Sequence, residues 1–543
     1  MRSDFIRIYK SVHTWTGIVA GMALFIAFYA GAITIFKEPL VRWATPPSAT
    51  HGQAIALDQA PLLIAQTLRD HPAAARDFRL PLQSAEHLPG GLSWAVRENE
   101  ADDHDHSSAR HYFAIPEDGG TVRVEENHPS ELAEFIDVLH RVAGLPFDTD
   151  PNRWVMGIIA ALYTLALVSG VIVLLPSLVK DFFALRVGKN IKRMWLDAHN
   201  VVGIISLPFH VVMALTAVVF AYHDGFYFIQ DKLIHDGKWA TAFSRGGPPT
   251  SAAPRDPAAM RSPAELLANV RALSPGFEPT SLQYLNATGP RATVRVWGHD
   301  PSAHSPRFLG GFVALDPYSG KVINADFLPG QQSLPNAVVG SFFALHFGTY
   351  GGTPVQWMYF LLGLAGAWLF YGGNLLWLET RRIKAAKRDD GSGVPPEQRR
   401  DVRWMAAGTV GVCLGAVCGI SLTIVAAKWL QGRVDDLNTW HLGLYYTVFF
   451  GALAWAFRCG AARSAIHLLW LAAAFTIAIP LTSLLAWLLP SLGMWAHGSS
   501  ATLGVDATAL AGGLCFVWLA RATHRRAMEG PVDSVWSLRR GKA

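Results

Sequence analysis

The feature that most constrains this chain is a series of long apolar runs with almost no charge. A helix needs about 20 predominantly apolar residues to cross the hydrocarbon core of a bilayer. Eight runs of this kind occur, at residues 18–36, 154–179, 200–222, 353–378, 404–427, 439–457, 465–490 and 499–520, the last of which contains Asp506. The sequence therefore predicts an all-α polytopic membrane bundle of about eight transmembrane helices.

The composition agrees with this prediction and excludes other classes. Of 543 residues, 51% are hydrophobic and 16% are charged, whereas soluble domains carry about 25% charged residues. The formal net charge of +5 comes from basic residues beside the apolar runs, where topology explains it. We therefore expect a lipid bilayer as partner and no nucleic acid.

The distribution of basic residues predicts the orientation. Eight spans put both termini on one side, and the loops that share this side carry the basic residues Arg2, Arg7, Lys10, Lys180, Arg186, Lys189, Lys192, Arg193, the group from Arg381 to Arg403, Arg458, Arg463 and the tail from Arg521 to Lys542. Cytoplasmic loops are enriched in Lys and Arg, so both termini are predicted to be cytoplasmic. The first run is longer than a signal-peptide core and is interpreted as an uncleaved anchor.

Two large polar segments, about 41–150 and 224–350, are then predicted to lie outside the membrane. They contain no Cys, because Cys413, Cys418, Cys459 and Cys515 all fall in or beside the C-terminal apolar runs. Disulfides are therefore not expected to stabilise these segments. The chain also lacks a C-x-x-C-H sequence, which excludes covalent c-type haem.

An internal repeat organises residues 1–380. Each half has a His-x-x-x-Gly sequence at the start of an outward span, a predicted external hairpin, and a Leu-His pair shortly before the next span. The repeated elements are His13 to Gly17 with His199 to Gly203, Tyr112 to Ile115 turning at Gly119-Gly120 with Phe312 to Val322, and Leu139-His140 with Leu345-His346. Two units of helix, external segment and helix, related by duplication, follow from this pattern.

The four repeated histidines are candidate ligands of two b-type haems. His13 and His199 fall at the cytoplasmic starts of spans, and His140 and His346 fall on the external side. Two neutral imidazoles on opposing helices can supply the axial ligands of a haem, and ionisable residues in a membrane are functional candidates. Residues four apart on a helix share a face, so Gly17, Gly203 and Gly144 are predicted to leave room for a flat macrocycle beside these rings. Zinc fits the pattern less well, because no close ligand set recurs in both halves.

Other histidines leave alternatives open. His210 follows His199 by about 16 Å on the same face of a straight helix, so one helix could serve two cofactors; equally, Pro208-Phe209-His210 could be a kink with a hydrogen-bonding histidine. His223 and His441 could line the outer site or act as anchors. His467 and His497 have no repeat partner and are interpreted as structural, and the acidic stretch from Asp102 to His106 with His111 is interpreted as a solvated loop, with metal capture as the alternative.

At these same residues the chain resembles the PepSY-associated transmembrane family of iron-regulated inner-membrane proteins, which includes siderophore reductases. The likeness covers about residues 1–380 and rests on His13-Thr14-Trp15-Thr16-Gly17, Leu139-His140-Arg141, Ala198 to Gly203, Leu345 to Thr349 with Gly351-Gly352, and the Leu315 to Gly320 turn, which is similar to the external PepSY signature. Thr14 and Asn200 depart from the aromatic or basic residues usual after the first and third histidine.

The resemblance implies a bacterial inner-membrane, multi-pass protein with two α+β PepSY-like periplasmic domains. The implied division is 1–40 (N-terminus and first span), 41–150 (first periplasmic domain), 151–223 (second and third spans), 224–350 (second periplasmic domain), 351–380 (fourth span), 381–403 (cytoplasmic linker), 404–521 (four-helix extension) and 522–543 (cytoplasmic tail).

The function implied is a di-haem oxidoreductase that moves electrons across the membrane to ferric iron or ferric siderophores. The cytoplasmic loops are too short for a nucleotide-binding domain, so a quinol or a soluble reductase is expected as electron donor. Arg141, Arg153 and Trp154 could contact an anionic chelate, although anchoring is the usual role of such residues. The alternatives are a non-catalytic sensor or scaffold that binds a periplasmic peptide or protein, and a transporter, to which only Lys428 and Asp506 point.

Overall fold

The fold was analysed from a computed structural model of the chain. It describes residues 3–47, 55–83, 91–96, 110–117, 121–127, 130–179, 191–234, 255–303, 310–386 and 398–539. The chain divides into two compact units. Unit 1 comprises Met1–Ala44, Ser130–Ala221 and Trp357–Ala543, and unit 2 comprises Thr45–Pro129 and Tyr222–Gln356.

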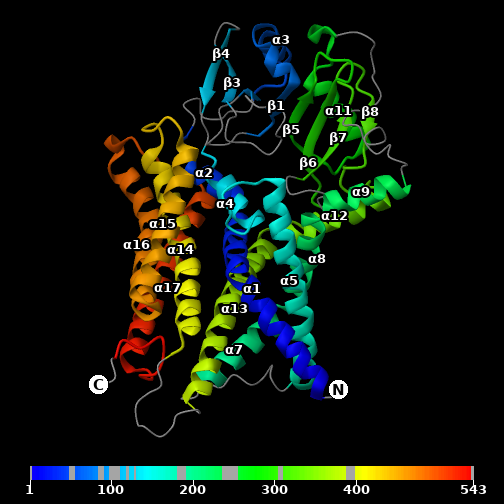
Figure 1. The fold of residues 1–543 in the computed structure, drawn as a ribbon. Helices are drawn as coiled ribbons and strands as arrows, with labels where there is room; N and C mark the ends of the chain where they lie inside the picture. Colours follow the sequence, from blue (N-terminus) through cyan, green and yellow to red (C-terminus); the bar gives the residue numbers. More distant parts are fainter. Residues whose placement is uncertain are drawn as a thin grey trace. The chain divides into compact units, whose positions relative to one another are not determined.

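Unit 1 is helical, and its long helices match the predicted spans (Figure 1). They are α1 (Ser3–Thr34), α5 (Asp150–Leu174), α7 (Ile191–Ile205), α8 (Leu207–Ala221), α13 (Gly352–Ala386), α14 (Arg400–Leu430), α15 (Leu437–Cys459), α16 (Ala461–Leu488) and α17 (Ser500–Glu529). Among the described residues, 7 helices are long and apolar enough to cross a membrane, or up to 8 if the bent pair α7 and α8 is one span. The prediction of a multi-pass helical bundle is confirmed at this level.

The third predicted span is not one straight helix. α7 and α8 meet at Ser206 with a bend of 69°, and Pro208 is the second residue of α8. Proline has no N–H to donate to the preceding turn, and its ring clashes with that turn's carbonyl. The expectation that His199 and His210 share one face of a straight helix is therefore wrong, and the kink considered as its alternative is present.

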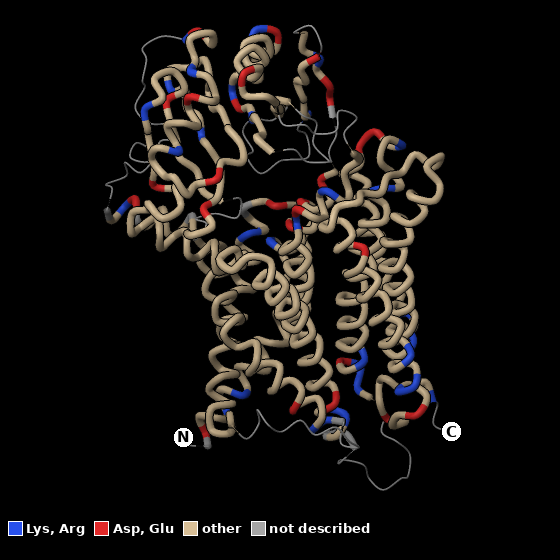
Figure 2. The backbone as a smooth tube through the Cα atoms, turned by 180° about the vertical axis from the view of Figure 1, so that it is seen from behind, with Lys and Arg blue, Asp and Glu red and all other residues tan. Residues whose placement is uncertain are grey.

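The two chain ends of unit 1 lie at the same end of the bundle. The first turn of α1 and the segment that follows α17 lie at the same end of the bundle, on opposite sides of it, as the letters N and C mark in Figures 1 and 2. α1 begins at Ser3, so its helical conformation includes His13 rather than beginning there. An even number of crossings is consistent with this placement.

Unit 2 contains one antiparallel sheet of eight strands in the order β4-β3-β2-β1-β5-β6-β7-β8. The strands are β1 (Asp77–Pro81), β2 (Leu92–Val96), β3 (Arg110–Pro116), β4 (Val122–Asn127), β5 (Glu278–Leu285), β6 (Thr293–His299), β7 (Gly311–Leu315) and β8 (Val322–Asn324). A helix precedes each set of four, α3 (Ala60–Asp70) before β1 and α11 (Pro263–Leu273) before β5. The duplicated organisation expected from the sequence is therefore visible in the sheet.

The two predicted hairpins are confirmed. β3 pairs with β4 from His111↔Asn127 to Pro116↔Val122, although the Gly119-Gly120 turn lies outside the described residues. β7 pairs with β8, and the turn between them is closed by the Asp316 carboxylate, which accepts hydrogen bonds from the backbone N–H groups of Tyr318 and Ser319. Arg255 binds the second oxygen of this carboxylate at 2.9 Å.

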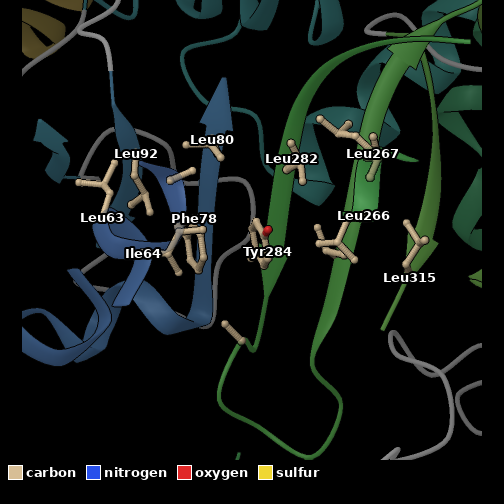
Figure 3. Packing of buried hydrophobic residues seen from close by; sticks show 14 of the residues in the cluster. Leu63, Ile64, Phe78, Leu80, Leu92, Leu266, Leu267, Leu282, Tyr284 and Leu315 are labelled. Carbon is tan, nitrogen blue, oxygen red and sulfur yellow. The ribbon is translucent and has the colours of Figure 1, made fainter. Parts of the chain in front are cut away.

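The two polar segments share one core because β1 pairs with β5 along five residues, from Asp77↔Leu285 to Pro81↔Ser281. Phe78 and Tyr284, from the two halves, stack at this joint with ring centroids 4.6 Å apart. Leu residues of α3 and α11 cover the same face of the sheet (Figure 3). Burial of this apolar surface joins segments that are about 200 residues apart in sequence.

The C-terminal helices of unit 1 are joined to the N-terminal part by a buried polar network. Trp43, in α2 (Lys37–Ala44), donates its indole N–H to Asp506 at 2.9 Å and to Ser483 at 3.1 Å. The buried Lys428 ammonium lies 3.8 Å from the Trp43 ring centroid and donates to Ser483. The two charges that pointed to a transporter are thus held by protein partners.

This network predicts a stability effect. Replacing the buried Trp43 by Ala removes a large side chain from a packed site and is expected to cost about 3–5 kcal/mol. Trp43→Phe keeps most of the packing but leaves the Asp506 and Ser483 bonds unmade, for which about 1–3 kcal/mol is expected. Thermal unfolding of the detergent-solubilised full chain should therefore rank wild type above Trp43→Phe, and Trp43→Phe above Trp43→Ala. Equal midpoints would contradict the role of this network.

Candidate functional site: facing histidines in unit 1

Two of the predicted ligands, His13 on α1 and His199 on α7, face each other inside unit 1. Their ring centroids are 6.2 Å apart and their planes are inclined by 72°. Metal–imidazole bonds are about 2 Å long, so two imidazoles on opposite sides of one metal have ring centres about 6 Å apart. The observed separation fits a site in which both rings bind one iron.

A backbone carbonyl fixes the His13 ring. Its Nδ1 lies 2.8 Å from the carbonyl oxygen of Ala166 on α5, and a carbonyl can only accept, so Nδ1 carries the proton. In the neutral imidazole Nε2 then presents a lone pair. Histidines that bind metals usually donate their other N–H in this way. Gly170, on the same helix as Ala166, provides the space, because a Cβ there would lie 2.9 Å from Nδ1 and Cε1 of His13.

His199 supplies a buried nitrogen that lacks a protein partner. Its Nδ1 makes no hydrogen bond to any described residue. Leaving a buried polar atom unpaired costs about 1–3 kcal/mol, so such an atom indicates a missing partner such as water or a ligand. Gly373 of α13 faces this ring, with its Cβ position 3.7 Å from Cε1. His13 and His199 therefore have the spacing and the free room expected of two residues that would hold an iron porphyrin between them.

His210 forms a different arrangement, with a tyrosine. Its Nδ1 lies 2.6 Å from the Tyr163 hydroxyl, which also donates to the His210 carbonyl oxygen at 3.1 Å. The single phenol proton can be donated to the carbonyl, with Nδ1 as the donor to the hydroxyl oxygen, or to Nδ1 itself, so these contacts do not fix the tautomer of His210. Nε2 is buried and makes no hydrogen bond within the described chain. The hydrogen-bonding histidine predicted as one alternative is present. Tyr163 contacts one of its ring nitrogens, and the other is buried and unbonded within the described chain.

His140 repeats the His13 arrangement in another part of unit 1. It lies at the end of α4 (Leu132–Arg141), and its Nδ1 is 2.7 Å from the Ala27 carbonyl oxygen of α1. Again the carbonyl must accept, so Nε2 carries the lone pair. Gly31 of α1 makes room, since a Cβ there would lie 2.7 Å from Nδ1 of His140. Ala27 lies about 21 Å beyond His13 along α1, at 1.5 Å per residue. His13 itself and the carbonyl that binds His140 therefore lie at two depths along this helix.

The fourth predicted ligand, His346, belongs to unit 2. It lies in the last turn of α12 (Leu334–Phe347), which ends at Gly348 with φ 65°. His140 belongs to unit 1. The pairing of His140 with His346 therefore stays a prediction.

The glycines that make room for the rings are not those predicted. Cβ atoms at Gly17 and Gly203 would meet no described atom within 4 Å, so these residues do not pack against His13 or His199. The helix of His140 ends before Gly144, which has φ +86° and lies against Ile26. The prediction assumed contact within one helix, whereas Gly170 and Gly31 lie on neighbouring helices.

An ion network holds α4 in place. Lys37 binds Glu134 and Asp137, and Arg141 binds Asp148 at 2.7 Å. Burial by itself would raise the pKa of Asp137, but the charges of Lys37 and then Arg141 hold it below its ordinary value.

Arg153 also binds Asp148, at 2.8 Å, so both arginines predicted near the outer site have carboxylate partners. Anchoring of these arginines at the membrane interface stays a prediction.

The remaining candidates contribute less to this site. His441 is buried with both ring nitrogens unbonded within the described chain, whereas His467 is exposed and accepts from Trp455. His223 packs on Tyr227 in α9 (His223–Ile234), and residues 102–106 lie outside the described residues. His497 lies just before α17, where its carbonyl accepts from Thr502. Where the chain is described, no group of three or more His, Cys, Asp or Glu is placed to hold a metal ion, a test that does not address a site of two histidines.

Sequence reasoning missed Tyr163, Gly170, Gly31 and the two accepting carbonyls. No local signal marks them, because each meets its histidine only through helix packing. Ala166, for example, follows His13 by 153 positions. A search for small residues in the facing spans could have suggested Gly170 and Gly31, but not which histidine each contacts.

The fold and the facing histidines define a multi-pass membrane protein with a duplicated antiparallel sheet unit and imidazoles held between its helices. Comparison with protein families gives the same answer more specifically. The chain belongs to the family described as the PepSY-associated TM region, which matches residues 10–380 and thus more than half of its length. A search of the curated proteins returned no match.

The ion network that holds α4 predicts different effects for two cations of α2. Lys37→Met removes one of the two cations that bind Glu134 and Asp137, both mostly buried, and leaves them only Arg141, so the thermal midpoint of the full chain is expected to fall by a few degrees. Arg42→Met is the matched control, because its pair with Glu38 is largely exposed and such pairs contribute about 0–1 kcal/mol. A smaller fall for Lys37→Met than for Arg42→Met would show that the network does not hold α4.

Proposed function

We propose that this protein is a di-haem oxidoreductase that moves electrons across the bacterial inner membrane and reduces ferric iron or ferric siderophores on the periplasmic side. Family membership supports the membrane class, and the histidines support the chemistry. Iron porphyrin bound between paired imidazoles would supply one-electron redox chemistry, with a potential set by axial ligands, hydrogen bonds and burial. Both termini would be cytoplasmic, as the basic loops predict.

The observation that carries this proposal is the geometry of His13 and His199. With a centroid separation of 6.2 Å, both rings would be close enough to hold one iron between them. The Ala166 carbonyl holds His13 in the tautomer that presents Nε2. A structural histidine pair would instead be expected to exchange a hydrogen bond or to satisfy its buried nitrogens, and Nδ1 of His199 is unsatisfied.

The second cofactor would be held on the periplasmic side by His140. The Ala27 carbonyl and Gly31 set the tautomer and position of this ring in the same way. The predicted partner is His346, and His210 is the alternative, because its buried Nε2 makes no hydrogen bond within the described chain. At the level of His140, Phe28 follows Ala27 on α1 and packs on Tyr163, Phe370 and His210, so aromatic rings fill this part of unit 1.

The electron donor would be a membrane quinol or a soluble reductase, because the loops on the cytoplasmic side offer no room for a nucleotide-binding domain. The acceptor would bind on the side of unit 2. A sensor or scaffold in which the histidines are structural is the competing function, and the spectrum of the purified protein separates the two.

Purified from haem-replete cells, the full chain is expected to show a Soret band, split reduced α-bands and about two haems per chain. His199→Ala is expected to remove about half of the bound haem, because one axial ligand of the cytoplasmic pair is lost. The measurements are the visible spectrum and a haem-to-protein ratio. His467→Ala is the control, since this exposed side chain contacts Trp455 away from the facing rings. A colourless preparation, or full haem content in His199→Ala, would favour the scaffold.

A second test changes the space beside a ligand and not the ligand itself. Gly170→Val places side-chain atoms where His13 Nδ1 and Cε1 now lie, so the ring must move and the cytoplasmic haem should be lost or show an altered Soret maximum and potential. Gly451→Val is the matched control, because a Cβ at this membrane-helix glycine meets no described atom within 4 Å. An unchanged spectrum and potential in a folded Gly170→Val protein would contradict the placement of the His13 ligand.

A further inference from the structure

Two short helices of unit 2 have apolar surfaces that the protein leaves uncovered. α9 (His223–Ile234) has 12 residues and α12 (Leu334–Phe347) has 14. At 1.5 Å per residue they are about 18 and 21 Å long, too short to cross a hydrocarbon core of about 30 Å. Neither helix is among the helices that are long and apolar enough to cross a membrane, although α12 is apolar along its length.

The exposed side chains of both helices are large and apolar. In α9, Phe228 is 63% and Leu233 79% exposed, and Phe226 and Ile229 are about half exposed. In α12, Leu334 is 79% and Val338 50% exposed. Gly340 and Ala344 of α12 are buried, so the helix packs its small residues inward and presents the large ones outward. This arrangement is the reverse of the one expected for a helix that faces water.

Chain continuity limits where these helices can lie. α9 begins at His223, directly after α8 ends at Ala221, and α12 ends at Phe347, shortly before α13 begins at Gly352. α8 belongs to the bent spanning pair, and α13 is a spanning helix. Each short helix therefore has one end within a few residues of a point where the chain leaves the bilayer.

We propose that α9 and α12 lie in the plane of the membrane surface, with these apolar side chains inserted among lipid headgroups and the first acyl carbons. Interfacial helices place Phe and Leu on the lipid side and basic residues toward the headgroups. In α9, the Lys232 ammonium lies 5.8 Å from the Phe228 ring centroid, as in a side chain that lies along the apolar face and keeps its charge at the surface.

The consequence concerns both the sheet unit and His346. In the second half of unit 2, the chain arrives from unit 1 through α9 and returns to unit 1 through α12. Two lipid-bound helices would therefore hold the eight-stranded sheet at the membrane surface. His346 lies in the last turn of α12 and would stay at the depth of the headgroups. The inference concerns lipid contact alone and does not depend on haem.

The proposal is tested by spin-label accessibility in the full-length protein, with its four cysteines replaced and the chain reconstituted into nanodiscs of phosphatidylcholine and phosphatidylglycerol. Single cysteines at Phe228, Leu233 and Val338 would carry a nitroxide, and its collisions with O2 and with a water-soluble nickel chelate would be measured. Leu165, exposed on the spanning helix α5, is the lipid control, and Lys321, exposed in unit 2, is the water control.

Labels at the three test positions are expected to collide with O2 several times more often, relative to nickel, than the label at Lys321 does, with a depth between those of the two controls. A label at Lys232 should report a shallower depth than one at Phe228. Nickel-dominated collisions at the test positions would mean that these helices lie in water. Low collision with both reagents would mean that protein covers them. Either result overturns the proposal, and the haem content of the same samples reports separately on the proposed function.

Discussion

This structure depends on one constraint: polar groups buried inside an apolar helix bundle need hydrogen-bond partners. A bilayer supplies no water to a buried imidazole, so the protein must provide its partners or leave a place for a ligand. Unit 1 provides such partners at His13 and His140. One ring nitrogen of each is bound to a backbone carbonyl of a neighbouring helix, and because a carbonyl can only accept, Nδ1 is the donor in both rings. The same requirement explains why Trp43, Lys428, Ser483 and Asp506 form a closed network.

Helix packing turns this local chemistry into a site. α1 contributes His13, the carbonyl that holds His140, and the glycine that makes room for that ring. α5 contributes the corresponding carbonyl and glycine for His13. Each of these two helices therefore supports a histidine of another element. A change in helix packing would move the histidine rings even where no histidine is replaced. The bend between α7 and α8 allows His199 to face His13 while His210 faces Tyr163.

The duplication has different outcomes in the two units. In unit 2 it produces two similar sets of a helix and four strands that join at β1 and β5 and bury one shared core. In unit 1 the two repeated histidine motifs no longer have equivalent surroundings. His13 is bonded to a carbonyl, whereas Nδ1 of His199 is buried and makes no hydrogen bond to the described part of the chain. A duplicated sequence can thus form one symmetric sheet and one asymmetric histidine pair.

The sequence by itself determined the spans, the two hairpins, the repeat and the candidate histidines, because hydrophobic length, alternation and turn residues act over short distances along the chain. It predicted the wrong glycines, because these depend on what lies on neighbouring helices. It also left open whether the third span is straight or kinked, which depends on how Pro208 breaks the hydrogen-bond ladder. Only the tertiary structure decided that His13 faces His199, that Ala166 and Ala27 hold the rings, and that one sheet joins the two polar segments. These contacts join residues more than 100 positions apart, and their energy comes from packing and burial, which no local pattern specifies.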